Sequence, residues 1–194
     1  VDARLDELLT LVCGTHAAVQ NHSRSFDADA HHALARRAAA ESTVLLKNED
    51  DLLPLAAGTK VAVIGDFAET PRYQGAGSSA VNSIKVDSLL GCWNESGLEQ
   101  VGFAVGFDRQ GKPDAAKQAE AVALAQKADV VLLCMGLDEI KESEGIDRSD
   151  MCVAANQIEL LRALQKVNPN IVVVLSAGAS VETSWANHCK ALVY

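Results

Sequence analysis

The chain has 194 residues, of which 48% are hydrophobic and 22% charged, a balance typical of a folded globular protein and not of a disordered one. Its formal net charge is -9 and it has no basic run longer than Arg36-Arg37, so we expect neither nucleic acid nor an anionic membrane as a partner. No apolar run approaches the roughly 18 residues that suggest a membrane-spanning helix.

The five cysteines are widely spaced and form no C-x-x-C pair, which does not resemble a disulfide framework. Cys134 lies inside an apolar run, where a thiol usually serves as a small core side chain. This usage favours a reducing compartment, so we expect a cytoplasmic protein. The lack of a signal peptide adds little, because Val1 does not look like a natural start and we expect residues to be missing before it.

Two helices are predicted ahead of the first clear strand. Residues 2–12 place leucines and a valine three and four positions apart, and Gly14 is expected to end that helix. Residues 14–27 show no periodicity and are predicted to be a linker. A longer, alanine-rich helix is predicted over residues 29–48. We assign residues 1–56 to a helical connector.

From residue 57 onward, short apolar strands alternate with helices. Strands are predicted at 60–65, 101–106, 130–135, 171–175 and 191–194, and helices at 86–95, 113–127, 154–167 and 180–188. Continuously apolar strands that alternate with helices indicate an α/β fold with an open, mostly parallel β-sheet and helices on both faces. We therefore expect a three-layer α/β/α sandwich over residues 57–194, truncated at its C-terminal end and preceded by the helical connector.

Ligands of open parallel sheets bind at the carboxyl ends of the strands. This rule selects three loops, at residues 66–83, 137–150 and 177–180, and predicts that they meet at one edge of the sheet. The first loop is rich in glycine and serine, the second is acidic, and the third is built from small residues.

The acidic loop holds six carboxylates between residues 138 and 150, opposed only by Lys141 and Arg148. Neighbouring negative charges raise the pKa of a carboxylic acid, which a general acid requires, and Gly145 allows a sharp turn among them. Arg148 is expected to pair with Asp147 or another nearby carboxylate. A solvated acidic loop is the plain alternative, and a divalent metal site is a weaker one because the spacing does not match an EF-hand.

The glycine-rich loop contains GAGSSA at residues 75–80, which fits one form of the dinucleotide fingerprint. However, nine residues separate it from the preceding strand, and no apolar helix follows it. The amide and hydroxyl groups of Tyr73, Gln74, Ser78 and Ser79 suit a hydroxyl-rich ligand better, because such groups both donate and accept hydrogen bonds. A nucleotide-binding doubly wound domain stays as an alternative.

Four segments carry a family signal in their order and spacing. They are ARRAAAESTVLLKNEDDLLPL (35–55), KVAVIGDFAETPRYQGAGSSAVN (60–82), ADVVLLCMGLDEIKESEGIDRSDM (128–151) and PNIVVVLSAGASVETSW (169–185). Together they resemble the second, α/β-sandwich domain of glycoside hydrolase family 3, the family of many β-glucosidases. The resemblance covers nearly all of the chain from residue 35 onward.

This resemblance implies retaining hydrolysis of β-glycosides. In the family an aspartate nucleophile comes from an N-terminal (β/α)-barrel domain, which this chain lacks, and the acid/base glutamate comes from this domain, in a loop resembling E-S-E-G-x-D-R. Glu144, directly before Gly145, is our first choice for the acid/base and Glu142 is the second. Asp147 and Arg148 are expected to support the loop.

The segment from Tyr73 to Ser79 resembles the family loop that borders the aglycone side of the sugar. The residues that we expect to bind substrate there are Tyr73, Gln74, Gly77, Ser78 and Ser79. The implied partners are a β-glycoside, either an oligosaccharide or an aryl or alkyl glucoside, and the barrel domain of the same protein. We expect no metal and no other cofactor, and no activity from this chain alone. A non-catalytic carbohydrate-binding module is a further alternative.

Overall fold

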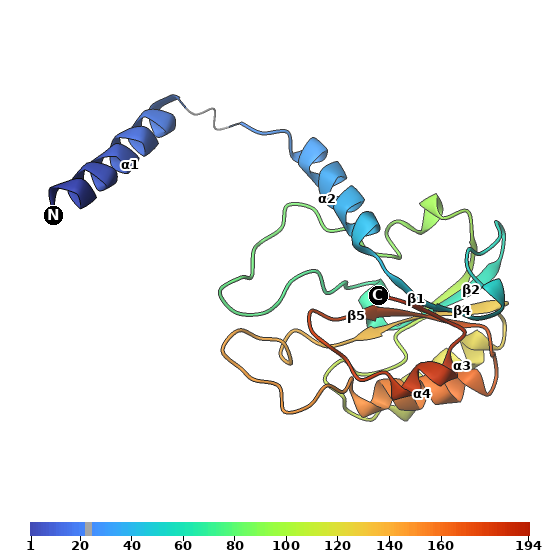
Figure 1. The fold of residues 1–194 in the computed structure, drawn as a ribbon. Helices are drawn as coiled ribbons and strands as arrows, with labels where there is room; N and C mark the ends of the chain where they lie inside the picture. Colours follow the sequence, from blue (N-terminus) through green and yellow to red (C-terminus); the bar gives the residue numbers. More distant parts are fainter. Residues whose placement is uncertain (22–24) are drawn as a thin grey trace. The chain divides into compact units, whose positions relative to one another are not determined.

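The computed structural model describes residues 1–21 and 25–194, and the chain divides into two compact units, residues 1–42 and 43–194 (Figure 1). The first unit holds α1 (Asp2–Asn21) and α2 (Ala28–Ser42). α1 continues past Gly14, where we predicted its end. A single glycine disfavours a helix by only about 1 kcal/mol, and good helix formers follow it. α1 therefore takes up residues 14–21 of the linker predicted at 14–27, and residues 22–24 of that linker lie outside the described residues.

The predicted second helix was too long at its carboxyl end. α2 stops at Ser42, and β1 (Leu45–Asn48) follows it in extended form. β1 pairs antiparallel with β6 (Ala191–Val193) at the other end of the second unit. Because β1 belongs to the sheet, the compact unit begins at Thr43 and not at the predicted residue 57.

The second unit is built on a six-stranded sheet with the order β1-β6-β5-β4-β2-β3, in which every pair except β1–β6 is parallel. The remaining strands are β2 (Lys60–Ile64), β3 (Glu99–Ala104), β4 (Val130–Gly136) and β5 (Ile171–Ser176). The predicted open, mostly parallel α/β sheet is thus confirmed. β3 starts two residues earlier than predicted, because an edge strand tolerates polar residues such as Glu99 and Gln100.

Helices α3 (Ala115–Ala125) and α4 (Ala155–Gln165) lie side by side below the sheet in Figure 1. The connection between β2 and β3 runs on the other side, where the helix predicted at 86–95 is only a short 3-10 turn. Asp87, Ser88 and Gly91 in that stretch favour turns over helix. The predicted helix at 180–188 is also reduced to a 3-10 turn. Within residues 43–194 the 3-10 turns are η1 (Glu49–Asp51), η2 (Asp66–Ala68), η3 (Trp93–Glu95) and η4 (Ser184–His188).

The core lies between the sheet and the two helices, and it includes fully buried residues such as Ile64, Leu133 and Leu161. Buried Gln157 of α4 fixes the end of β4, because its amide accepts from the Gly136 N–H at 2.9 Å and donates to the Gly136 carbonyl at 3.0 Å. Gly136 has no room for a side chain, since a Cβ there would lie 1.9 Å from the Ser176 carbonyl oxygen of β5. The acidic loop therefore starts from a fixed point.

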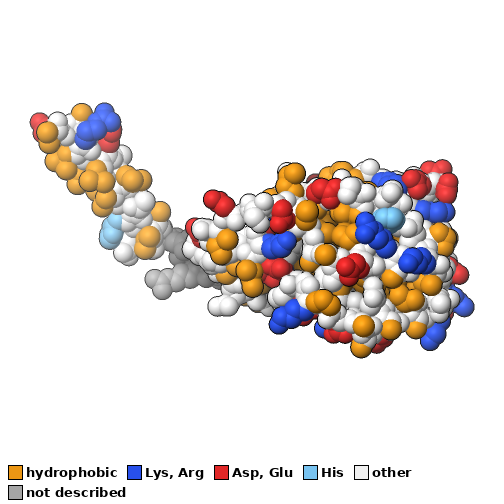
Figure 2. Space-filling view, turned by 90° about the horizontal axis from the view of Figure 1, so that it is seen from below, with side chains coloured by type: hydrophobic (Ala, Val, Ile, Leu, Met, Phe, Trp, Pro, Cys, Tyr) orange, Lys and Arg blue, Asp and Glu red, His pale blue; other side chains and the backbone are white. Residues whose placement is uncertain are grey.

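The surface that α3 and α4 present mixes acidic and basic side chains without a large patch of one sign (Figure 2). None of the helices within residues 1–21 and 25–194 is long and apolar enough to cross a membrane.

Candidate active site

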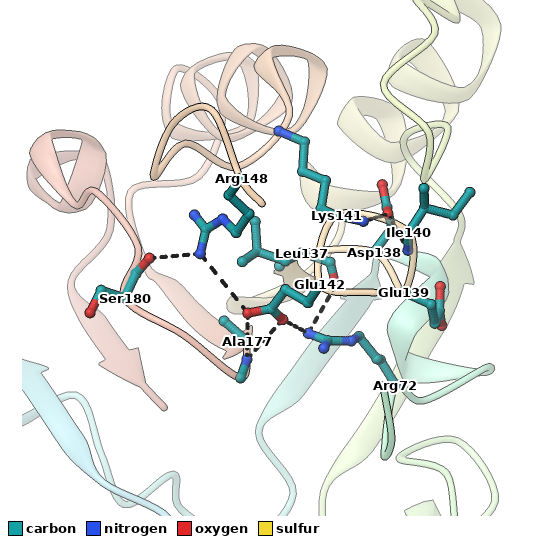
Figure 3. Close-up of polar contacts among 12 residues, drawn as sticks. Arg72, Leu137, Asp138, Glu139, Ile140, Lys141, Glu142, Arg148, Ala177 and Ser180 are labelled. Atoms are coloured by element: carbon teal, nitrogen blue, oxygen red, sulfur yellow. Dashed lines mark hydrogen bonds and ion pairs between the residues drawn. The ribbon is translucent and has the colours of Figure 1, made fainter. Parts of the chain in front are cut away.

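The three loops that we selected from the carboxyl ends of the strands meet at the carboxylate of Glu142 (Figure 3). Arg72 comes from the loop after β2, Glu142 and Arg148 from the acidic loop after β4, and Gly178 from the loop after β5. The predicted convergence of these loops at one edge of the sheet is confirmed.

Glu142 is almost completely enclosed, with 8% of its side chain exposed. Its Oε2 atom forms an ion pair with Arg72, whose side chain is 7% exposed, and accepts the Gly178 N–H at 2.9 Å. Its Oε1 atom lies 3.9 Å from Nη1 of Arg148. A buried ion pair is tolerated when additional hydrogen bonds satisfy it, as the Gly178 N–H does here. Both carboxylate oxygens of Glu142 therefore face groups of the protein.

Arg148 pairs with Glu142, a neighbouring carboxylate, and not with Asp147, which was the other partner that we considered. Its Nη1 also donates to the Ser180 carbonyl at 3.0 Å, which ties the acidic loop to the loop after β5. Asp147 is exposed at the surface of the acidic loop. Arg148 thus contacts both Glu142 and the loop after β5, whereas Asp147 makes neither of these contacts.

Most of the other carboxylates in the acidic loop also have defined partners. Asp138 is buried and accepts the backbone N–H groups of Ile140 and Lys141, each at 2.8 Å. Asp150 accepts the Cys152 N–H at 2.8 Å, and this hydrogen bond is the main reason why its pKa lies below the ordinary value. Several carboxylates of the loop thus have hydrogen-bond or ion-pair partners, both within the loop and in neighbouring loops, which differs from the alternative of a solvated acidic loop.

Glu144 lies two residues beyond Glu142 and is exposed. The Ser78 hydroxyl donates to Glu144 Oε2, and the Ser78 backbone N–H donates to the same oxygen at 3.0 Å. These two hydrogen bonds, the hydroxyl bond first, hold the pKa of Glu144 below its usual range because they favour the charged form. Glu144 is therefore an exposed carboxylate that Ser78 holds in place, at the edge of the sheet where the carboxyl ends of the strands lie.

The glycine-rich loop fits closely against this glutamate. The Glu144 N–H donates to the Ala76 carbonyl at 3.2 Å, and Ala76 and Ser143 form an isolated parallel bridge. Gly77 has a φ of 102°, and a Cβ there would lie 2.9 Å from the Cβ of Glu144. Gly77 is thus required both by its backbone conformation and by the approach of Glu144.

The other residues predicted to bind substrate have different surroundings. Gln74 uses its side-chain amide within the loop, because it accepts the Val81 N–H at 2.9 Å and donates to the Val81 carbonyl at 3.2 Å. Tyr73 and Ser79 are exposed. The structure brings Gly77 and Ser78 against Glu144, whereas Gln74 closes the loop.

Comparison with known proteins identifies the family and the fold. Residues 43–194 match the model of the glycosyl hydrolase family 3 C-terminal domain. The chain belongs to glycosyl hydrolase family 3. An exo-α-(1→6)-L-arabinopyranosidase of Bifidobacterium breve is 43% identical over 204 aligned residues, which cover 100% of this chain and 27% of that protein. A thermostable β-glucosidase B of Acetivibrio thermocellus is 40% identical over 90% of this chain and 23% of its own length.

A solved structure supports the same assignment. The crystal structure of a family 3 β-glucosidase from Bifidobacterium adolescentis superposes with a TM-score of 0.90 at 47% identity, covering 96% of this chain and 27% of that one. The chain thus spans about a quarter of the length of the curated relatives it matches. The predicted family and the predicted α/β fold are both confirmed.

Two arginines near the candidate site of this family 3 domain were not predicted from the sequence. Arg72 lies in the glycine-rich loop, just before its GAGSSA segment, and that position was the available signal, because the topology predicts that this loop meets the carboxylates of the acidic loop. Arg109, from the loop after β3, had no such signal. Its Nε lies 2.8 Å from Asp66 and its Nη1 lies 2.8 Å from Glu139, while its guanidinium stacks 4.2 Å over Phe67. Arg109 therefore braces the start of the acidic loop.

Asp66 is the other partner in this brace. Burial raises its pKa above the ordinary value, against the opposing effect of its hydrogen bond with Arg109. Asp66 follows directly after β2 at the same edge of the sheet as Glu142. It faces Arg109 and not Glu144, so we treat it as part of the scaffold.

The alternatives from the sequence receive no support in this family 3 domain. The GAGSSA segment does not open a helix, which the dinucleotide fingerprint requires, and the next helical residues are those of η3 at Trp93. In the part of the chain that the structure describes, no three His, Cys, Asp or Glu side chains come together to hold a metal ion.

Proposed function

We propose that this chain is the domain of a retaining β-glycosidase that supplies the acid/base, Glu144, to a site completed by another domain of the same protein. The observation that carries the proposal is the difference between two neighbouring glutamates. Glu142 is enclosed by Arg72, Arg148 and Gly178, whereas Glu144 is exposed and held by Ser78. A proton donor must reach the substrate, which an exposed carboxyl group such as that of Glu144 can do and an enclosed one cannot.

The two steps follow from the chemistry of retaining glycosidases. In the first, a nucleophilic carboxylate of the other domain forms a bond to the anomeric carbon while the glycosidic C–O bond breaks, and Glu144 transfers its proton to the leaving oxygen. In the second, water attacks the anomeric carbon, the ester bond to the nucleophile breaks, and Glu144 takes up the water proton. The two carboxyl groups must stand about 5–5.5 Å apart.

The first step needs Glu144 in its protonated form, but the Ser78 hydrogen bonds favour its charged form. A second domain would oppose this effect in two ways, because burial and a nearby nucleophilic carboxylate both raise the pKa of a carboxylic acid. The proposed partner domain therefore completes the site by tuning Glu144 as well as by bringing the nucleophile.

Exposed apolar side chains in the same two loops support such a partner. Ile140 and Ile146 of the acidic loop are 63% and 59% exposed, and Val81 of the glycine-rich loop is 63% exposed. Apolar groups gathered at a functional edge mark a surface that another part of the protein covers. The (β/α)-barrel domain implied by the family is our proposed partner, and a β-glycoside is the proposed substrate.

The test uses the full-length protein and its Glu144→Gln variant. A dinitrophenyl β-glucoside needs little protonation of its leaving group, whereas cellobiose needs full protonation. We expect the variant to lose about 10²- to 10⁴-fold of its rate with cellobiose and far less in the glycosylation step with the dinitrophenyl glucoside. Azide, a nucleophile that needs no general base, should restore turnover and yield a β-glucosyl azide.

The matched control is Glu120→Gln, which removes an exposed carboxylate from α3, outside the three loops, and should leave both rates unchanged. An equal loss with both substrates, without an azide product, would contradict the assignment of Glu144. We also expect the 194-residue chain by itself to show no hydrolysis, since the proposed nucleophile belongs to the other domain. Turnover by the isolated chain that disappears with Glu144→Gln would contradict that expectation.

A further inference from the structure

We propose that Arg72 is a positioning residue, which holds the buried Glu142 carboxylate and thereby fixes the place of Glu144 at the edge of the sheet. The inference rests on the proposed function of Glu144. Arg72 itself meets no substrate in this scheme, because its side chain is 7% exposed and its contacts are internal.

Arg72 ties the acidic loop at two points. Its Nη1 forms the ion pair with Glu142, in the middle of the loop, and lies 3.4 Å from the carbonyl of Leu137, at the beginning of the loop (Figure 3). Leu137 is buried, and its N–H donates to Ser176 at the end of β5. The Arg72 guanidinium therefore holds Glu142 at a fixed position relative to Leu137, which is itself bound to the end of β5.

The other contacts of Glu142 come from the opposite side of the site. Gly178 donates its N–H to the carboxylate, and Arg148 is held by the Ser180 carbonyl 3.0 Å away. Glu142 thus links all three loops through one carboxylate. Removing Arg72 leaves this carboxylate buried with only the more distant Arg148 as a charged partner, which disfavours the present arrangement of the loop.

Glu144 is held by hydrogen bonds and, among the described residues, by no ion pair of its own. Its hydrogen bonds go to Ser78 and Ala76, both on the loop that carries Arg72. The Arg72–Glu142 pair and the Ser78–Glu144 contact therefore join the same two loops at neighbouring points. A loop freed at Glu142 would move Glu144 relative to the substrate, and a displacement of about 1 Å lowers a catalytic rate by as much as about 10²-fold.

The pairing makes a specific prediction for a double-mutant cycle in the full-length enzyme. Arg72→Met and Glu142→Met should each lower kcat/KM for cellobiose by about 30-fold or more, because each leaves the other charge buried without its partner. The double variant should lose no more than either single variant, since it removes both charges together. Arg72→Lys should recover part of the rate, because an ammonium keeps a positive charge for Glu142 but lacks the planar set of donors of the guanidinium.

Two further readouts separate positioning from proton transfer and from simple instability. Azide should yield no β-glucosyl azide with Arg72→Met or Glu142→Met, because Glu144 still serves as base in both. The alkaline limb of the pH profile should move to higher pH in these variants, since a Glu144 that leaves Ser78 loses the hydrogen bonds that lower its pKa. A loss of folded enzyme alone would reduce the rate without moving this limb.

Several results would overturn the proposal. These are an unchanged kcat/KM in both Arg72→Met and Arg72→Lys, strictly additive losses in the double variant, or an azide product from Glu142→Met, which would make Glu142 the acid/base. Should Arg72→Met fail to fold, Arg72→Lys and its pH profile decide the question. Failure of the proposed function is seen separately in the Glu144→Gln enzyme, either as full activity or as an equal loss with both substrates and no azide product.

Discussion

Ser78 donates two hydrogen bonds to a single oxygen atom of Glu144, one from its backbone N–H at 3.0 Å and one from its hydroxyl. Both bonds stabilise the carboxylate and lower its pKa. The glycine-rich loop thus shapes the acid/base chemistry that we assign to the acidic loop.

Ser78→Ala should move the alkaline limb of the kcat/KM profile of the full-length enzyme to higher pH. The substitution removes the hydroxyl hydrogen bond, which is the larger cause of the lowered pKa, so Glu144 stays protonated to a higher pH and remains a proton donor there. Kinetics measured across the pH range would show the shift. Ser83→Ala, an exposed serine of the same loop, is the control and should leave the limb in place. A limb that moves to lower pH would contradict the role of Ser78.

Gly77→Ala should impair the full-length enzyme by displacing Glu144. The new methyl group would lie 2.9 Å from Glu144 Cβ, in addition to the strain of a φ of 102°. Gly97→Ala is a matched control, because Gly97 also has a positive φ, of 70°, but a Cβ there meets nothing within 4 Å. We expect kcat/KM to fall roughly tenfold to 100-fold for Gly77→Ala. Equal effects of the two substitutions would show that backbone strain alone is responsible.

The elements that could be predicted from the sequence are those with a strong local signal. β2, β4 and β5 are short apolar runs, and their positions follow from hydrophobicity and flanking turns. β1 could not be recognised this way, because Leu45–Asn48 continues the pattern of a helix. Its state is decided by pairing with β6, which lies at the other end of the compact unit.

In the candidate site, too, some features follow from the local sequence and others depend on contacts between distant residues. The meeting of three loops follows from the topology of a parallel sheet, and the family resemblance narrows the acidic loop to Glu142 and Glu144. The difference between these two glutamates does not follow from the loop itself, because it depends on Arg72, which lies 70 positions away in the chain. A contact between distant residues leaves no periodic trace in a sequence. The family resemblance therefore ranked Glu144 ahead of Glu142, but the sequence did not show which of the two is buried.

Gln157→Leu should destabilise the chain by about 2–4 kcal/mol. The buried amide satisfies both the N–H and the carbonyl of Gly136, and leaving two buried backbone groups without partners disfavours the folded state by roughly 1–3 kcal/mol each. Urea unfolding followed by circular dichroism measures the difference. Gln126→Ala, at an exposed glutamine just after α3, should change the free energy of unfolding by less than about 0.5 kcal/mol. Equal stability of the Gln157→Leu and original chains would show that the Gly136 contacts are dispensable.

The five free thiols should react in an order set by burial. Cys13 and Cys152 are exposed, whereas Cys134 is buried in β4, where loss of hydration raises its pKa to about 12. Since the thiolate is the reactive form, Cys134 should resist a thiol reagent such as dithionitrobenzoate at pH 8, and Cys189, whose pKa burial also raises, should react slowly. Mass spectrometry of the labelled chain before and after unfolding in urea identifies each site. Labelling of Cys134 in the folded chain as fast as that of Cys152 would show that β4 opens readily, which a central strand of this sheet should not do.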